Sequence, residues 1–141
     1  MKDFLQFINQ LNPADVVVAK KKKGLGRVLN HYIVYVGDGV FIGNLKQGVK
    51  LLTYSELLEL LSDYEPVRAI PFNGSDYQRV QVVNRANARI GDRYSLLNFN
   101  CEHFANWVQK GKESSSQVIV GLFAFALIIF GLYKIKTNGK R

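Results

Sequence analysis

The fold of this chain is decided by residues 31–45, which read HYIVYVGDGVFIGNL. Two β-prone runs, 31–36 and 40–45, flank the turn Gly37-Asp38-Gly39. Short runs of this kind around a glycine-rich turn predict an antiparallel β-hairpin. Upstream, the β-branched run at residues 14–19 predicts a further buried strand. His31 stands at the start of the first hairpin strand.

Helices are expected after the hairpin. Thr53 followed by Glu56 forms a capping box, which predicts a short helix that ends before Pro66. Ser75 or Asp76 can begin a second helix, over residues 76–90. The amphipathic spacing of apolar residues 4–11 predicts another short helix near the start of the chain.

The sequence Asn100-Cys101-Glu102-His103-Phe104 contains the only cysteine in the chain. Asn100 is a good N-cap, so Cys101 is expected at the first position of a helix. Phe104 and two later apolar residues share its face, which predicts that one side of this helix is buried. A helix N-terminus favours a thiolate over a thiol. With a histidine as base, such a thiolate can perform nucleophilic acyl transfer.

The composition limits the classes of function. The 141 residues are 48% hydrophobic and 21% charged, which is ordinary for a globular domain. A lone cysteine excludes an intrachain disulfide framework and a cysteine-rich zinc site, and it fits a reducing compartment. We expect no cofactor and no metal. The formal charge is +8, which favours an anionic partner. Anionic lipid is favoured over nucleic acid, because the chain also carries a hydrophobic segment.

That hydrophobic segment is residues 118–133, a run without charge that is followed by basic residues. It predicts a single-pass transmembrane anchor, with a buried globular helix as the alternative. The expected organisation is a domain at 1–112, a serine-rich hinge at 113–117, the anchor at 118–133 and a basic tail at 134–141. Since the start of the chain does not resemble a signal peptide, a tail-anchored membrane protein with a cytosolic domain is expected.

Three features together resemble the lecithin retinol acyltransferase family, and in particular its small phospholipase A/acyltransferase branch among the permuted NlpC-type thiol hydrolases. The first is residues 31–39, which resemble its histidine box. The second is residues 100–104, which match its cysteine box. The third is the hydrophobic anchor behind them. The resemblance runs over residues 12–110 and implies an α+β fold, with a small antiparallel sheet packed on the nucleophile helix.

The resemblance also implies an activity. Cys101 would be the nucleophile and His31 its general base. The family takes an acyl chain from a glycerophospholipid, holds it as a thioester on cysteine, and passes it to water, an amine or an alcohol. A membrane anchor would place the thiol at the bilayer surface, where this substrate lies.

One departure from the family pattern affects the predicted site. The family usually has a second histidine twelve residues after the first, and here that position is Gly43. Asn44 is the nearest polar substitute, and an asparagine can orient a catalytic histidine. In a regular strand Asn44 lies on the opposite face from Gly43, so we expect that it needs a bulge to turn toward the histidine.

Two alternatives remain open at this point. The chain could be a catalytically impaired membrane module of the same fold, or an amide or peptide hydrolase like the NlpC-type relatives. Glu102 and His103 are expected to be structural. Contacts with substrate or membrane are expected from two tyrosines of the hairpin and a basic run before it: Tyr32, Tyr35, Lys20, Lys21, Lys22 and Lys23.

Overall fold

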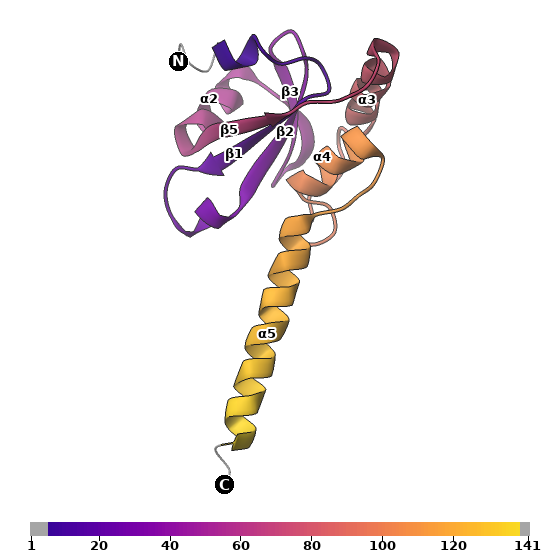
Figure 1. Cartoon of the computed structure of the whole chain (residues 1–141). Helices are drawn as coiled ribbons and strands as arrows, with labels where there is room; N and C mark the ends of the chain where they lie inside the picture. Colours follow the sequence, from indigo (N-terminus) through magenta and orange to yellow (C-terminus); the bar gives the residue numbers. More distant parts are fainter. Residues whose placement is uncertain (1–5, 139–141) are drawn as a thin grey trace.

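A computed structural model describes residues 6–138. It is an α+β fold built on one five-stranded antiparallel sheet in the order β4-β3-β2-β1-β5 (Figure 1). The strands are β1 (Val16–Lys21), β2 (Asn30–Gly37), β3 (Val40–Leu45), β4 (Gly48–Leu52) and β5 (Tyr64–Ile70). The helices are η1 (Leu25–Val28), α2 (Tyr54–Asp63), α3 (Asp76–Ala88), α4 (Cys101–Lys110) and α5 (Ser116–Asn138). The predicted fold class is confirmed.

The β2–β3 hairpin forms where the sequence predicted it. Ile33 pairs with Gly43 and Val34 with Ile42, and the register shifts between Tyr35 and Gly37. Both residues of the tight turn have positive φ, 51° at Asp38 and 73° at Gly39. This is the mirror-image turn whose twist suits a hairpin, and glycine adopts it without steric cost.

The sheet is buried on both faces, and successive residues of each strand alternate between them. One face packs against α3 and α4, and we call its core the thiol-side core; its sheet residues include Val16, Val18, Tyr32, Val34 and Ile42. The other face packs against α2, and we call its core the α2-side core; its sheet residues include Val17, Ile33, Tyr35 and Phe41. Successive residues of one strand therefore pack in different cores, which explains why the apolar runs are unbroken.

The helix starts follow the predicted caps. Thr53 caps α2 and Ser75 caps α3, each in a capping box. The helix α2 ends at Asp63, before Pro66, as predicted. Pro66 itself lies within β5, at the edge of the sheet, which the sequence did not indicate. An edge strand tolerates proline, because its outward N–H groups need no partner in the ladder.

The two chain ends are described in part. Residues 6–8 are helical, but residues 9–11 form a turn and irregular chain, so the helix is shorter than predicted at this end. Residues 4 and 5 of the predicted helix lie outside the described residues, as do residues 139–141 of the predicted basic tail. The helix α5 leaves the domain at one end and projects away from it (Figure 1). The most apolar 18-residue window of its segment Ser116–Thr137 has a mean hydropathy of 2.4, and none of that window is buried. By length and composition it can cross a membrane, which gives weak support for the predicted anchor.

Candidate active site

Cys101 is the first residue of α4, as predicted. Asn100 adopts an extended conformation before the helix, and its side chain accepts hydrogen bonds from the backbone N–H groups of Glu102 (2.9 Å) and His103 (3.1 Å). His103 completes the capping box, because its Nδ1 accepts the Asn100 N–H at 3.3 Å. His103 is therefore part of the helix cap, in keeping with the structural role expected of it.

The thiol lies against the backbone of β2. Its Sγ is 3.9 Å from the Asn30 carbonyl oxygen. Burial raises the pKa of Cys101 to about 11, although the backbone N–H groups of Tyr32 and Glu102 act to lower it. The expectation that the helix N-terminus favours a thiolate is wrong for this conformation, because desolvation of the charged form outweighs the helix dipole.

His31 lies on the other side of the same strand. Its Cα is paired with Ala19 of β1, and its ring is tilted against the Tyr64 ring, 5.4 Å between centroids. The imidazole borders a small cavity together with Ile33 and Leu57 of the α2-side core. Burial lowers the pKa of His31 to about 4. Its Nε2 is buried without a hydrogen-bond partner among the described residues.

The structure thus brings Cys101 and His31 near one another, but on opposite faces of β2. The thiol touches the backbone at residues 30 and 32, on either side of His31, while the imidazole follows the alternation toward α2. Both residues border one cavity of about 470 Å³ at the end of the strand. No hydrogen bond joins thiol and imidazole among the contacts of the described residues. Each is neutral at pH 7, and the general-base role of His31 stays a prediction.

Asn44 lies on the same side of the sheet as the thiol. It pairs with Val49 in an unbroken β3–β4 register, so the expected bulge beside Gly43 is absent. Without a bulge, the regular alternation turns Asn44 toward α4 and the thiol, not toward His31. The side chain is fully buried, and its Nδ2 donates to the Phe99 carbonyl at 2.7 Å. Asn44 therefore holds the loop before Cys101, and it lies on the opposite face from His31.

The two hairpin tyrosines separate in the same way. Tyr32 belongs to the thiol-side core, beside Cys101. Tyr35 belongs to the α2-side core, where its ring packs 5.1 Å from that of Phe41 and its hydroxyl accepts the Gly39 N–H. We expected both tyrosines to contact substrate or membrane. Tyr32 lies where it can contact an acyl chain held at the thiol, whereas Tyr35 lies on the other side of the sheet.

Glu102 is buried and joins the nucleophile helix to α5. Its carboxylate accepts hydrogen bonds from the Ser115 hydroxyl (2.6 Å), the Ser116 hydroxyl (2.6 Å) and the Gln117 N–H (3.1 Å). Burial raises the pKa of Glu102, but these hydrogen bonds outweigh it and hold the pKa below its usual value. A carboxylate at the start of a helix also suits the helix dipole. The sequence had predicted a hinge at 113–117, and Ser115 within it is buried.

Gln117 makes a second connection between α5 and the site, which the sequence did not reveal. Its Oε1 accepts the Asn30 N–H at 2.6 Å, and its Nε2 donates to the Asn30 carbonyl at 3.3 Å. The same carbonyl is the one that lies against Cys101. The first turn of α5 therefore holds the strand residue on which the thiol rests.

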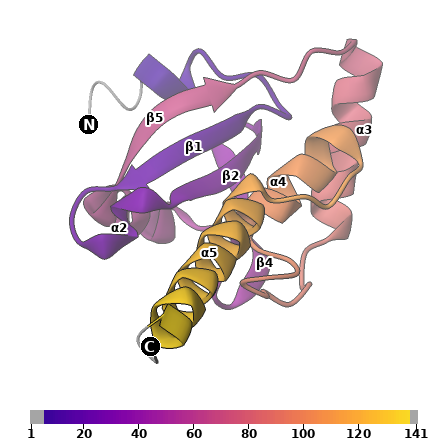
Figure 2. The same cartoon turned by 60° about the horizontal axis from the view of Figure 1, so that its bottom comes forward.

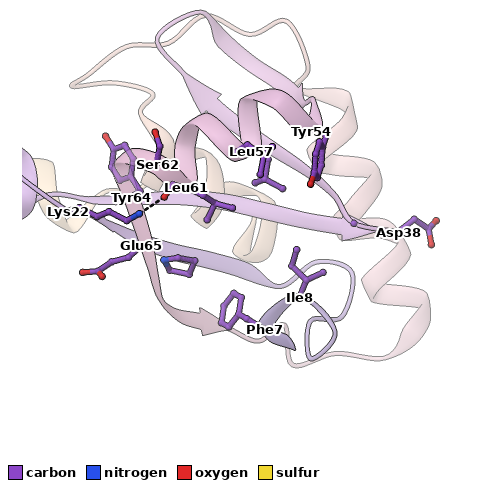
Figure 3. Close-up of a pocket in the computed structure, with 13 residues that line it drawn as sticks. Phe7, Ile8, Lys22, Asp38, Tyr54, Leu57, Leu61, Ser62, Tyr64 and Glu65 are labelled. Atoms are coloured by element: carbon purple, nitrogen blue, oxygen red, sulfur yellow. Dashed lines mark hydrogen bonds between the residues drawn. The ribbon is translucent and has the colours of Figure 1, made fainter. Parts of the chain in front are cut away.

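The basic run is divided between two regions. Lys20 and Lys21 belong to β1 rather than to a loop, and Lys21 borders the cavity at Cys101. Lys22 borders a larger cavity of about 870 Å³ on the α2 side, where its Nζ donates to the Leu61 carbonyl (Figure 3). Neither Cys101 nor His31 lines that cavity, so the candidate site is the smaller one. Membrane contact by these lysines stays a prediction.

Within residues 6–138 no group of three His, Cys, Asp or Glu side chains is placed to hold a metal ion. Around the thiol, the side chains of Asn100, Glu102 and Ser115 make hydrogen bonds. The Oδ1 atoms of Asn30 and Asn44 are buried without a partner among the described residues.

Comparison with known proteins gives one match. A family model described as lecithin retinol acyltransferase matches residues 61–114. The matched segment contains the whole helix α4 with Cys101, and it excludes the hairpin with His31 and Asn44. No curated protein matches the chain.

Proposed function

We propose that this chain, of which residues 61–114 match the lecithin retinol acyltransferase family model, is a membrane-anchored thiol acyltransferase or phospholipase A that acts on glycerophospholipids. The family implies acyltransferase or phospholipase-like activity. One observation carries the proposal: Cys101, the only cysteine, stands at the capped start of α4 and borders a cavity that the first turns of the apolar helix α5 also line.

The reaction proceeds in two steps. The Cys101 sulfur attacks the ester carbonyl, the S–H proton passes through a base to the departing alcohol oxygen, and an acyl thioester remains on the enzyme. Water, an amine or an alcohol then attacks the thioester, which returns the proton to sulfur and releases the acyl product. The Asn100 cap engages the N–H groups of Glu102 and His103, so the Cys101 N–H is the natural donor to the oxyanion.

His31 is the proposed base, and its use requires a local rearrangement. Its imidazole is neutral and can accept a proton, since its pKa is lowered to about 4 by burial. It must swing from the α2 side toward the cavity that both residues border, or the end of β2 must turn. A catalytic contact that forms only with substrate is compatible with this, because such contacts are often incomplete without it.

The first test is an acyl-enzyme measurement. The full chain in phosphatidylcholine-containing micelles is analysed by intact mass, with Cys101→Ala as control. A hydroxylamine-sensitive acyl adduct on the wild type alone supports the proposal. His31→Gln should then slow formation of the adduct by about 10²–10⁴-fold. A rate within threefold of the wild type would mean that another group accepts the proton.

A specific observation favours a second candidate, a catalytically impaired membrane module of the same fold. The thiol and the imidazole are on opposite faces of β2, both are neutral, and the family's second histidine is replaced by Gly43. The absence of an acyl adduct in a folded wild-type chain would favour this candidate. Release of amino acids from peptides, with phospholipid left intact, would instead support the amide hydrolase alternative.

A further inference from the structure

The cavity at Cys101 is built partly from the membrane helix. Along with Asn30 and Asn100, its lining includes Val118, Gly121 and Leu122 of α5. These three positions are spaced three and four residues apart, so they form one face of the helix. A Cβ atom added at Gly121 would meet nothing within 4 Å, so the cavity is open along this face of α5. We call this open face the Gly121 groove.

Other parts of the cavity lining carry exposed apolar side chains. Leu29 comes from the segment between η1 and β2, and Leu96 and Leu97 come from the loop before α4. They are exposed by 49%, 60% and 55%. This loop lies beside the first turns of α5 (Figure 2). Large apolar side chains gathered at one end of a domain mark a surface for another apolar phase.

The helix α5 indicates that this apolar phase is a lipid bilayer. It leaves the domain at this same end (Figures 1 and 2), and its 23 residues rise by about 34 Å, enough to cross a hydrocarbon core of ~30 Å. The hydrogen bonds of Glu102 and Gln117 hold its first turn against the site. The groove, the apolar rim and the start of the span therefore lie together at the level where the domain meets the bilayer.

We propose that the Cys101 cavity opens sideways into the bilayer, between α5 and the rim formed by Leu29, Leu96 and Leu97, and receives a lipid acyl chain along the Gly121 groove. The proposal rests on the proposed function for its substrate class, and it adds the route of entry. The substrate would not leave the membrane: its ester slides to the thiol while its chain stays in apolar surroundings. The cavity, about 470 Å³, is within the usual range of small-molecule sites.

The route can be tested through the single cysteine without any acyl transfer. In phosphatidylcholine vesicles, the thiolate of Cys101 displaces methanesulfinate from an alkyl methanethiosulfonate, and the resulting disulfide is read by intact mass. Dodecyl and methyl reagents are compared. Gly121→Leu should slow the dodecyl reaction about tenfold or more, since each buried methylene contributes a factor of about four, and leave the methyl reaction within twofold.

Gly131→Leu is the matched control, because Gly131 lies further along α5 and a Cβ there also meets nothing within 4 Å. Equal dodecyl rates for the two variants would overturn the proposed route. If the dodecyl selectivity appears but no acyl adduct forms from phosphatidylcholine, the proposed function fails and the route stands. If the adduct forms and Gly121→Leu has no effect on either reaction, the function stands and the route fails.

A second measurement tests the rim. Leu97→Cys in a Cys101→Ser chain is labelled with bimane and quenched by lipids brominated along their acyl chains. Tyr77→Cys, on the exposed start of α3, is the control. Strong quenching at residue 97 and none at residue 77 is expected. Equal and weak quenching at both positions would show that the rim does not enter the bilayer.

Discussion

Removing the Glu102 side chain should uncouple α5 from the nucleophile helix at a measurable cost in stability. In Glu102→Ala, the Ser116 hydroxyl can turn to water, because Ser116 is exposed. The Ser115 hydroxyl is 2% exposed and the Gln117 N–H is partly buried. Two donors stranded in this way cost about 1–3 kcal/mol each, so the free energy of unfolding should fall by about 2–6 kcal/mol.

Glu102→Gln should be much milder. The amide oxygen can still accept from Ser115 and Gln117, and the amide nitrogen can donate to the Ser116 hydroxyl. Only the additional strength of hydrogen bonds to a charged acceptor is lost, about 1 kcal/mol. Since 1 kcal/mol corresponds to roughly 4–8 °C in Tm for a domain near this size, the two variants should be clearly separated.

The assay is thermal unfolding in detergent micelles, followed by the fluorescence of Trp107, the only tryptophan in the chain. Glu59→Ala on the exposed face of α2 is the matched control and should change the free energy of unfolding by less than about 0.5 kcal/mol. Because the pKa of Glu102 is lowered from 4.5, its contribution is complete above that pH and is lost as the pH falls through the lower folded-state value. Glu102→Gln should lack this pH dependence. A Tm for Glu102→Ala equal to that of Glu59→Ala would refute the reasoning.

Three further predictions concern the thiol and the histidine face. Burial lowers the pKa of His31 from 6.5 to about 4, so between these pH values the unfolded chain binds more protons than the folded chain. The free energy of unfolding should therefore fall as the pH drops from 6.5 to about 4, and pH-dependent unfolding of His31→Gln should show a flatter slope. Burial raises the pKa of Cys101 to about 11, so its rate of alkylation by iodoacetamide should still be rising above pH 9.5, and a plateau near pH 8.5 would contradict the buried neutral thiol. Gly43→His should lower the free energy of unfolding by about 1–3 kcal/mol, because a Cβ there lies 3.2 Å from Ile33 Cγ2 on the α2 side. Formation of the acyl adduct should not become faster. A faster rate would show that a histidine at position 43 reaches the site.

The local structure could be predicted well from the sequence, because each signal depends on near neighbours. The turn at Asp38 and Gly39 specifies the hairpin through positive φ angles. Asn100 specifies the start of α4 through its hydrogen bonds to the first helical N–H groups. Pro66 marks the end of α2 as predicted, but its place in an edge strand could not be predicted, because strand order is not a local property.

The faces of the sheet could not be assigned from the sequence. The runs at β1 and β2 are apolar at almost every position, so alternation gives no indication of which half of the residues meets α4. A single step along the strand moves a side chain to the other face. Tyr32 and Asn44 therefore lie on the thiol side and His31 and Tyr35 on the α2 side. The hydrogen-bond partners of Glu102 and Gln117 could not be predicted for a related reason, since they lie 13–87 residues away in the sequence.

The candidate site and α5 are connected at one residue of the sheet. The backbone N–H and carbonyl of Asn30 are both held by the Gln117 side chain, and the same carbonyl lies against the Cys101 thiol. His31 is the next residue along the strand. Any turn of the strand end that brings its imidazole toward the thiol must therefore loosen or carry along the first turn of α5. Because Glu102 also fixes that turn from α4, the position of α5 and the distance between thiol and imidazole are mechanically coupled rather than independent of one another.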